Sequence, residues 1–465
     1  MHFDYSDRTK AMIDQLQAFM DAHVLPANRR FHDLADQGIY PLEVIEPLKS
    51  RAFQDGLWNL FMPDLDPEDP GTRLTNLEYA PLAEIMGRVP WSPEVFNCNA
   101  PDTGNMEILK RFATPEQKKR WLDPLMMGEL RSVVGLTEPD TASSDLTNLA
   151  TTITRDGDHY VVNGRKWFST GAKHPNAKLS LVFGVSDGAE DADPHRKHSF
   201  VLVPMDTPGV RVVRDVPIMH HHAPEGHCEV LYDNVRVPLD AMLGQEGDGF
   251  MLAQARLGPG RIHHCMRTIG QCELALELMC ERALERRTFG KALADNANIQ
   301  DWIARSRIEI DNARMRILHT AWKMDMAGAR AARVDVSAIK VTAARRQTQV
   351  VDRAMQEGAV GMSTGLFYAP QSFSTTEEVI ELAKVAASYG GTYDTHMRDE
   401  SSYSIGLLGA VGEALRVGRE ADITVNISHI KALGVDVWGQ SQQVIEMIRA
   451  ARAQGQRVTA DQYPY

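Results

Sequence analysis

The sequence has little cysteine and none of the cysteine spacing that is typical of a metal site or a redox pair. Its five cysteines are scattered, and no two of them form a CxxC motif: Cys98, Cys228, Cys265, Cys272 and Cys280. An odd, dispersed set argues against a disulfide framework and against a zinc ribbon. We therefore expect reduced thiols and a cytoplasmic protein.

The sequence also lacks long apolar runs and long basic runs. No apolar stretch reaches the ~18 residues that a membrane-spanning helix needs, so we expect no membrane span. Residues 1–20 place acidic side chains within a helical pattern and contain no signal-peptide core. The formal net charge is −12 and no block of Lys or Arg opposes it, which argues against a general nucleic-acid-binding role.

What the sequence does contain is four successive regions with different secondary-structure patterns along 465 residues. Residues 1–130 carry a helical pattern, and residues 131–245 change to short strands, with Asn163-Gly164 as an expected hairpin turn. Residues 246–356 return to helices. From residue 357 onward strands and helices alternate, as they do in a parallel sheet or a (β/α) barrel.

These four patterns predict a multidomain fold. We expect an all-α N-terminal domain (1–130), a small β-barrel middle domain (131–245), a helical C-terminal domain that is truncated (246–356) and a partial (β/α) barrel (357–465). The last part has room for about four strands, whereas a closed (β/α) barrel needs eight. The sequence therefore predicts an incomplete barrel at its C-terminal end.

Three separated motifs in the second and third parts carry chemistry. They are "VVGLTEPDTASSD" (133–145), "NGRKWFSTGA" (163–172) and "ERALERRTFGK" (281–291). Taken singly, each has an ordinary structural interpretation: Thr-Glu-Pro is a common turn, Trp167 is a core aromatic, and the Arg286-Arg287 pair suits a solvated helix end.

Together, in this order and spacing, the three motifs resemble the acyl-CoA dehydrogenase family over residues 1 to about 356. The resemblance is closest to the subfamily numbered ten and eleven, which shares "LTEPDxASSD" and "RLGPGRIHHCMR", here Leu136–Asp145 and Arg256–Arg267. It implies an FAD-dependent oxidoreductase that acts on the CH–CH bond of a fatty acyl-CoA thioester. It also implies a homodimer or homotetramer that passes electrons to an electron-transfer flavoprotein.

The resemblance assigns one set of residues to FAD: Leu136, Thr137, Ser143, Ser144, Trp167, Ser169, Arg286 and Phe289. In the family's pattern the Leu-Thr turn hydrogen-bonds the flavin ring, the serine pair lies near the flavin phosphate and the acyl-CoA, and the tryptophan packs on the flavin. The next serine lies near flavin N5, and the Arg-Phe pair reaches the FAD of a neighbouring subunit. Arg261 matches an active-site arginine and is expected to bind substrate.

The same resemblance exposes a gap in the dehydrogenase part. Desaturation needs a carboxylate within reach of the α-proton. The family supplies it after a Gly-rich stretch, but here "EGAVGMSTGL" (357–366) follows "VVDRAMQ" (350–356). Other branches place the base just before the residue that matches Arg261, and that position is Gly260. We therefore find no catalytic base and expect dehydrogenation to be impaired.

Two histidines indicate a second candidate site. His396 and His429 each fall where an expected strand ends, on consecutive βα units, and imidazole is a good zinc ligand. The segments "GAVGMSTGLFYAP", "THMRDE", "ISHIKALG" and "VTADQYPY" together resemble N-acyl-D-amino-acid deacylases of the amidohydrolase superfamily. The resemblance implies that His396 and His429 are zinc ligands and that Lys431 holds a substrate carboxylate.

That second resemblance is also incomplete. The family's HxH pair, bridging cysteine and late catalytic aspartate have no counterpart, so we expect weak or absent zinc binding and an inactive hydrolase part. No Pro/Gly/Ser linker separates the two parts, whereas fused domains are usually joined through exposed linkers. A chimeric chain with a seam at about 345–360 and no intact active site is therefore a further hypothesis.

Overall fold

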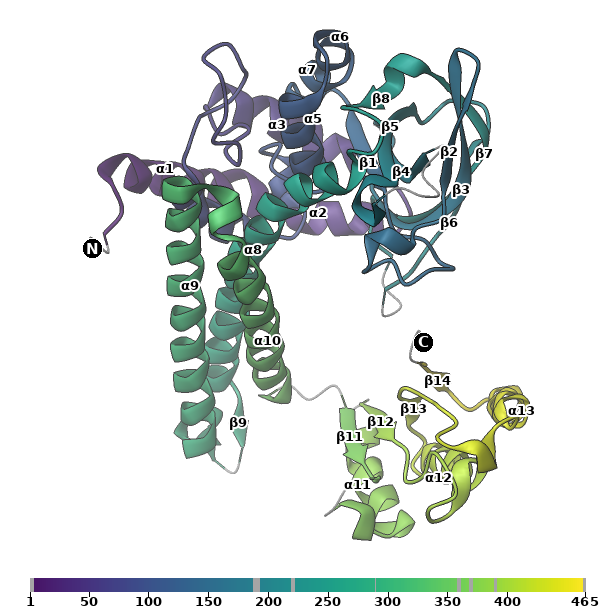
Figure 1. Cartoon of the computed structure of the whole chain (residues 1–465). Helices are drawn as coiled ribbons and strands as arrows, with labels where there is room; N and C mark the ends of the chain where they lie inside the picture. Colours follow the sequence, from purple (N-terminus) through teal and green to yellow (C-terminus); the bar gives the residue numbers. More distant parts are fainter. Residues whose placement is uncertain are drawn as a thin grey trace. The chain divides into compact units, whose positions relative to one another are not determined.

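The computed structural model describes residues 4–186, 193–218, 222–288, 290–357, 361–367, 371–388 and 391–462. Two compact units divide the chain. The N-terminal unit is Met1–Glu277 with Ala297–Val350, and the C-terminal unit is Leu278–Asn296 with Val351–Tyr465 (Figure 1). Each unit is described below on its own.

Helices build the first part of the N-terminal unit, as the sequence predicts. They are α1 (Asp7–Phe19), α2 (Leu25–Ala35), α3 (Leu42–Gln54), α4 (Asn76–Gly87), α5 (Asp102–Phe112), α6 (Pro115–Gln117) and α7 (Asp123–Met126), with π turns at Met20–Val24 and Lys118–Leu122. Thr75 and Glu78 form a capping box that starts α4, and Thr114 and Gln117 form another that starts α6.

An eight-stranded sheet follows these helices in the N-terminal unit. Its strands are β1 (Arg131–Gly135), β2 (Thr152–Asp156), β3 (His159–Thr170), β4 (Ala177–Ser186), β5 (His198–Pro204), β6 (Val210–Asp215), β7 (His227–Pro238) and β8 (Met242–Leu243). The order is β6-β7-β3-β2-β4-β5-β8, and β1 pairs with β4 in parallel. Among the described pairings β6 and β8 are the two ends, so the expected closure into a barrel is not seen.

The expected hairpin turn at Asn163-Gly164 is wrong. Both residues lie inside β3, and the turn between β2 and β3 is at Gly157, where φ is 62°. Gly164 is needed for close packing instead, because a Cβ there would lie 2.3 Å from Thr151 Oγ1. The pairing of β3 with β7 also shifts register beside Gly164, which is the behaviour of a bulge.

Three long helices follow the sheet: α8 (Gly249–Glu285), α9 (Ala297–Ala331) and α10 (Arg333–Glu357). A short hairpin, β9 (Arg287–Thr288) with β10 (Lys291–Ala292), joins α8 to α9. Within the N-terminal unit α8 approaches α4 closely, since a Cβ on Gly270 would lie 1.9 Å from Glu84 O. Arg314 of α9 reaches both carboxylate oxygens of Glu84 at 2.9 Å, so α4 is held from two sides.

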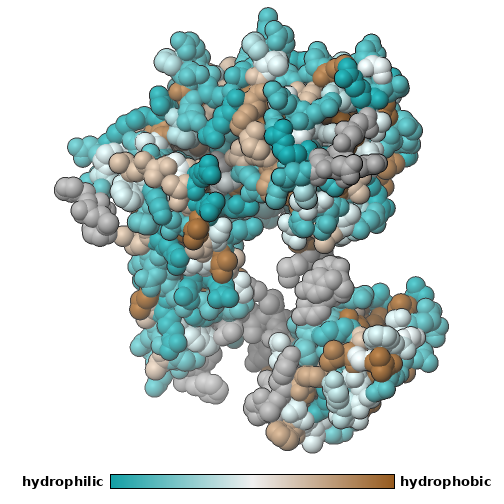
Figure 2. All heavy atoms as spheres, viewed as in Figure 1, coloured by the Kyte–Doolittle hydropathy of each residue, from teal (hydrophilic) through white to brown (hydrophobic). Residues whose placement is uncertain are grey.

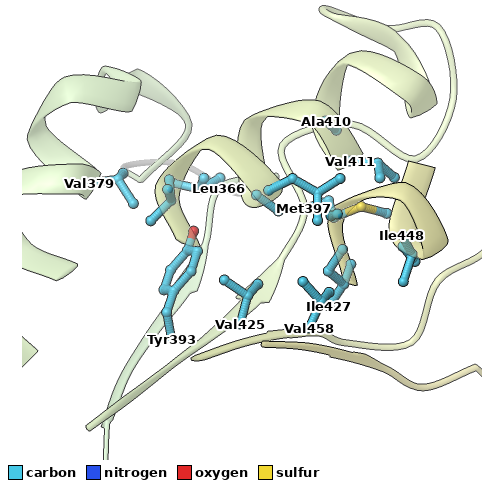
Figure 3. Packing of buried hydrophobic residues seen from close by; sticks show 14 of the residues in the cluster. Leu366, Val379, Tyr393, Met397, Ala410, Val411, Val425, Ile427, Ile448 and Val458 are labelled. Atoms are coloured by element: carbon cyan, nitrogen blue, oxygen red, sulfur yellow. The ribbon is translucent and has the colours of Figure 1, made fainter. Parts of the chain in front are cut away.

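The C-terminal unit contains a parallel four-stranded sheet in the order β11-β12-β13-β14. The strands β11 (Gly361–Gly365), β12 (Thr392–His396), β13 (Thr424–Ile427) and β14 (Val458–Ala460) alternate with helices α11 (Thr376–Ser388), α12 (Gly406–Glu420) and α13 (Ser441–Ala453). Buried strand residues, among them Tyr393, Val425 and Ile427, pack against the helices (Figure 3).

The strand–helix alternation predicted after residue 357 is therefore present, with four parallel strands. In the described residues these strands form an open sheet, so a barrel is not confirmed. All four strands run in the same direction, so their carboxyl ends lie along one edge of the sheet. Side chains that follow β12 and β13 are thereby brought together.

The surface carries the apolar side chains of an ordinary globular protein. The face seen in Figure 2 is mainly hydrophilic, with apolar atoms scattered over it. Exposed apolar residues on α9 include Ile308, Trp322 and Met326. Across the described ranges no helix combines the length and the apolar character needed to cross a membrane.

Candidate functional site

The turn that follows β1 is fastened to β3 by a buried ion pair. Lys166 is fully buried, and its Nζ donates to Glu138 Oε1 at 2.7 Å and to the carbonyl of Leu136 at 3.0 Å. Glu138 also accepts the backbone N–H groups of Ala150 and Thr151 at 2.8 Å. The pair therefore holds the Leu136-Thr137 segment against the strand that carries Trp167.

Burial and attraction act in opposite directions on this pair. Burial lowers the pKa of Lys166 to about 8, although Glu138 favours the charged amine. For Glu138, burial alone would raise the pKa, but attraction to Lys166 and the hydrogen bonds outweigh burial and lower it. Both groups are thus held in their charged forms near neutral pH.

A bulge at the end of β3 redirects Trp167. The pairing of β3 with β7 shifts register between Lys166 and Ser169, and Phe168 adopts a φ of 48°, which is uncommon for a residue with a side chain. The Trp167 N–H leaves the strand ladder and donates to the carbonyl of Thr137 at 3.0 Å. The bulge therefore joins two of the sequence motifs directly.

Two buried donors at this bulge have no partner. The indole Nε1 of Trp167 and the hydroxyl Oγ of Ser169 are both buried, and neither makes a hydrogen bond within the described part of the chain. A buried donor without an acceptor costs about 1–3 kcal/mol. Two such donors, two residues apart on one strand, indicate a place where a ligand supplies acceptor atoms.

The serine pair of the first motif lies in the same turn but is used differently. Ser143 Oγ accepts the N–H of Glu138 at 2.8 Å and donates to the carbonyl of Glu138 at 3.1 Å, so it closes the turn internally. Ser144 is exposed. The structure thus places Leu136, Thr137 and Ser143 in one turn, with Ser144 at its surface.

Two histidines of the C-terminal unit meet at the carboxyl edge of its sheet. His396 ends β12, His429 follows β13 with a φ of 42°, and His396 Nδ1 lies 2.8 Å from His429 Nε2. Glu400, which is 1% exposed, completes a group whose possible ligand atoms all lie within 4.8 Å of one another. The sequence predicts the two histidines, and the structure adds Glu400.

Lys431 belongs to the same cluster. Its Nζ lies 2.7 Å from Glu400 Oε1 and 3.1 Å from His429 Nδ1, so it occupies donor positions beside two of the possible ligands. Burial lowers the pKa of His396, Glu400 opposes this shift, and the neighbouring His429 ring and Lys431 add to it. A neutral imidazole is the form that binds a metal ion.

Family models for the acyl-CoA dehydrogenases match most of the chain. The N-terminal domain model matches residues 6–129, the middle domain model residues 133–235 and the C-terminal domain model residues 247–400. The chain is also 48% identical to "Probable acyl-CoA dehydrogenase FadE2" of Mycobacterium tuberculosis over 78% of its own length and 89% of that protein's.

The chain belongs to the acyl-CoA dehydrogenase family. The solved "Structure of a putative acyl-CoA dehydrogenase from Mycobacterium abscessus" is similar to it with a TM-score of 0.72 and 46% identity, over 77% of this chain and 89% of that one. "Acyl-CoA dehydrogenase family member 11" of Gallus gallus is 44% identical over 78% of this chain, and the chain spans 47% of that longer protein.

The C-terminal domain model extends beyond the seam that the sequence predicts at about 345–360. It reaches residue 400 and so includes β11, α11 and β12 of the C-terminal unit. The resemblance of that unit to a deacylase rests on its sequence motifs alone.

The remaining dehydrogenase motif residues lie on or beside α8. Arg261 is half-buried on α8, and no hydrogen bond or ion pair of its side chain is found in the described regions. Arg286 is exposed just after α8 ends, where its carbonyl accepts the N–H of Leu293 at 2.8 Å. The prediction for Phe289 lies outside the described residues.

The residues near Trp167 fit a flavin on physical grounds. The isoalloxazine edge carries carbonyl oxygens and ring nitrogens, and these atoms accept hydrogen bonds from donors such as the two that lack a partner here. The sequence predicts Trp167 and Ser169 as flavin residues, and it does not single out Glu138 and Lys166. Both lie inside the quoted motifs, and only their burial reveals that they position the turn.

Proposed function

We propose that the chain is an FAD-dependent oxidoreductase of the acyl-CoA dehydrogenase type, acting on the CH–CH bond of a fatty acyl-CoA thioester. The observation that carries the proposal is the pair of buried donors on Trp167 and Ser169, beside a turn that Lys166 holds in place. Membership of a family of flavoprotein oxidoreductases supports the same conclusion.

In this proposal the N-terminal unit provides most of the cofactor contacts. Leu136 and Thr137 present backbone groups to the flavin ring, Trp167 covers the ring, and Ser169 donates a hydrogen bond near N5. The exposed Ser144 faces the phosphate and acyl-CoA side. FAD, when bound, supplies the hydride acceptor.

The remaining assignments concern assembly. Arg286 and Phe289 would reach the FAD of a neighbouring subunit in a homodimer or homotetramer, and an electron-transfer flavoprotein would reoxidise the cofactor. The exposed position of Arg286 at the end of α8 is compatible with a contact outside its own subunit. A guanidinium at that place offers several planar donors to a pyrophosphate.

The proposed dehydrogenase is slow because α-proton removal lacks a base. Position 260, one residue before the substrate-binding Arg261, is glycine, and a Cβ there would meet no atom within 4 Å. The two buried carboxyl groups on α5 are poorly suited, because Asp102 is tied to Arg131 and Ser132 and burial raises the pKa of Glu107 to about 8. We therefore expect the protein to bind FAD and the thioester but to catalyse dehydrogenation very slowly.

A flavin titration tests the cofactor assignment. The purified wild-type protein should bind FAD and turn yellow, whereas Trp167→Phe and Ser169→Ala should each weaken FAD binding about 5- to 10-fold, because each removes one donor. Trp322→Phe, at an exposed site on α9, is the matched control and should change nothing. A colourless protein that takes up no added FAD would contradict the proposal.

Anaerobic mixing with an acyl-CoA tests the impairment separately. The thioester should bind and perturb the flavin spectrum, while bleaching of the flavin should be very slow because the base is missing. Rapid bleaching would show that a base is present and that the impairment is wrong. That result would leave the flavin assignment intact.

A second candidate function is zinc-dependent deacylation of N-acyl-D-amino acids in the C-terminal unit. The observation in its favour is the group formed by His396, Glu400 and His429, with Lys431 placed to hold a substrate carboxylate. Tetrahedral zinc with Zn–N bonds of about 2.1 Å separates two nitrogens by roughly 3.4 Å, more than the 2.8 Å between His396 Nδ1 and His429 Nε2. We propose weak zinc binding after a small ring movement, and no deacylation.

Metal analysis decides this second candidate. Zinc should bind the wild-type protein weakly, and His429→Ala should abolish that binding because only two ligands remain. Hydrolysis of an N-acyl-D-amino acid by the zinc-loaded protein would overturn the proposed inactivity. Absence of zinc uptake would remove the metal assignment altogether.

We also propose that the chain is chimeric, with the dehydrogenase domains at 1–130, 131–245 and 246–356 followed by a segment of different origin. The separate core of the C-terminal sheet supports this proposal, while the family match through residue 400 limits it. Sequencing the locus across codons 330–380 tests it directly. If the native locus encodes a continuous dehydrogenase without the C-terminal segment, the present chain contains an artificial junction. If the native locus encodes the present sequence, the fusion is natural.

A further inference from the structure

Arg256 is a partly buried cation of the N-terminal unit without an ion-pair partner. It lies near the start of α8, where its Nε donates to Asn105 Oδ1 at 2.7 Å and its Nη2 donates to the carbonyl of Pro101 at 3.3 Å. Both acceptors are uncharged. Among the described residues Arg256 forms no ion pair, although Glu107 and Asp102 attract its charge.

The nearest acidic side chains attract Arg256 but form no ion pair with it. Asp102 accepts from Ser132 N at 2.7 Å and pairs with Arg131, so its oxygens are already used. Burial raises the pKa of Glu107 to about 8, so this carboxyl is mostly protonated at neutral pH. Burial lowers the pKa of Arg256 itself only to about 10, and it stays positively charged.

There is open space on α8 within one helical turn after Arg256. Gly260 follows Arg256 by one helical turn on the same face of α8, and a Cβ on Gly260 or on Gly258 would meet no atom within 4 Å. Part of the Arg256 side chain stays exposed. In the loop before α5, Asn99 Oδ1 is buried and has no partner among the residues described.

Arg256 is also connected to the flavin-motif strand. The Pro101 ring, whose residue accepts from Arg256, comes within 3.7 Å of the position that a Cβ on Gly171 would take, and Gly171 lies two residues after Ser169. Arg256 is thus connected through a single residue to the end of β3. It also precedes Arg261 by five residues on the same helix.

We propose that Arg256 binds a carboxylate on the acyl group of the substrate, so that the preferred thioester has a dicarboxylic acyl chain rather than a plain alkyl chain. The inference rests on the proposed thioester function and adds a substrate class to it. A guanidinium matches a carboxylate with two parallel hydrogen bonds, and Arg256 has donors left for them. An alkyl chain at the same place would leave the charge without compensation.

A purely structural role explains less. Arg256 does connect α8 to α5, and Gly104 allows the close approach, since a Cβ there would lie 3.0 Å from Arg256 Cγ. A connection to two neutral oxygens needs hydrogen-bond donors but no charge, and burying an unpaired charge is costly. An anionic ligand explains why position 256 carries a positive charge.

Calorimetry with matched thioesters on the FAD-supplemented full chain tests the proposal. Succinyl-, glutaryl- and adipyl-CoA are compared with butyryl-, pentanoyl- and hexanoyl-CoA, so that each pair shares its CoA and its chain length. For at least one pair the wild-type protein should bind the dicarboxylic thioester about tenfold more tightly or better. Equal affinity in every pair, or a preference for the alkyl chain, overturns the proposal.

Three variants separate binding from structure. Arg256→Met keeps the apolar stem and should bring the affinity ratio to about one or reverse it, while Arg256→Lys keeps the charge without the fork and should give an intermediate ratio. Asn105→Asp leaves Arg256 in place but offers it an anionic partner, and it should also remove the preference. If Asn105→Asp or Arg256→Met keeps the wild-type ratio, the proposal is wrong.

The same measurements distinguish other oxyanions and other failures. Affinities for FAD and for free CoA should be unchanged in Arg256→Met; a fall in either assigns the arginine to a phosphate instead and overturns the proposal. Alkyl thioesters that bind without any dicarboxylic preference leave the proposed function standing and remove only this inference. If no thioester binds at all, both fail.

Discussion

Lys166 Nζ lies 2.7 Å from Glu138 Oε1 in a position where the lysine is fully buried, and the pair joins the turn after β1 to β3. The same ammonium donates to the carbonyl of Leu136, and the next residue, Trp167, donates its N–H to Thr137. One buried pair therefore controls the spacing of two segments that we assign to the flavin.

Removing the lysine should damage both stability and cofactor binding. Lys166→Met leaves the Glu138 carboxylate buried without its cation, and breaking a buried pair in this way costs roughly 3–5 kcal/mol. We expect a lower urea midpoint for the N-terminal unit and weaker FAD binding, because Leu136 loses its tether. Circular dichroism during urea unfolding and a flavin titration measure the two effects.

A surface pair of the same sheet provides the control for Lys166→Met. Arg236 Nη1 lies 2.6 Å from Asp156 Oδ2, and both side chains are exposed. Exposed pairs contribute about 0–1 kcal/mol, so Arg236→Met should barely move the urea midpoint or the FAD affinity. Equal losses in the two variants would show that burial of the Lys166 pair is unimportant.

The sequence predicts the order of helical and stranded regions because periodicity and capping are local properties. Thr114 and Gln117 start a helix as expected, and the alternation after residue 357 corresponds to four parallel strands. The turn expected at Asn163-Gly164 fails for a non-local reason: Gly164 is required by Thr151, which packs against it from another segment. A contact of that kind leaves no local signal.

The site shows the same division between local and non-local information. Trp167, Ser169, His396 and His429 can be found from motifs and from strand ends. Lys166 and Glu400 cannot be found in this way, because a charged residue in a motif is usually exposed. Their exposed fractions of 0% and 1% are known only from the folded structure.

Glu107 makes the stability of the N-terminal unit depend on pH. Burial raises the pKa of Glu107 to about 8, above its value in an unfolded chain, so the folded state keeps a proton that the unfolded state releases. Wild-type stability therefore falls as the pH rises from about 4.5 to 8. Glu107→Gln removes this loss, and its advantage over the wild type should grow over that range to a few kcal/mol.

Urea midpoints at pH 5, 6, 7, 8 and 9 measure the effect of Glu107→Gln. Glu116→Gln, at an exposed site on α6, is the control for replacing a carboxyl group by an amide. A constant difference between Glu107→Gln and the wild type over the whole range would contradict the raised pKa.

Lys431 competes with a metal ion for Glu400. Its Nζ lies 2.7 Å from Glu400 Oε1, so zinc must displace the ammonium and also bear its repulsion. Lys431→Met should therefore tighten zinc binding several-fold, read as a larger thermal shift at equal zinc concentration. Lys384→Met, which breaks an exposed pair with Glu381 in the same unit, is the control. Weaker zinc binding in Lys431→Met would show that the lysine supports the site.

The C-terminal sheet should unfold independently of the flavin site. Ile427 is fully buried in β13, within the core formed with residues such as Val425, Val458 and Ile448 (Figure 3). Ile427→Ala should cost about 2–5 kcal/mol in the unfolding of that unit, and FAD binding should stay unchanged because the flavin-motif turn lies in a separate unit. Leu382→Ala, at a side chain 60% exposed on α11, should cost less than about 0.5 kcal/mol. Thermal unfolding followed by circular dichroism, together with a flavin titration, decides the matter: parallel losses of C-terminal stability and FAD affinity in Ile427→Ala would mean that the two units depend on each other for folding.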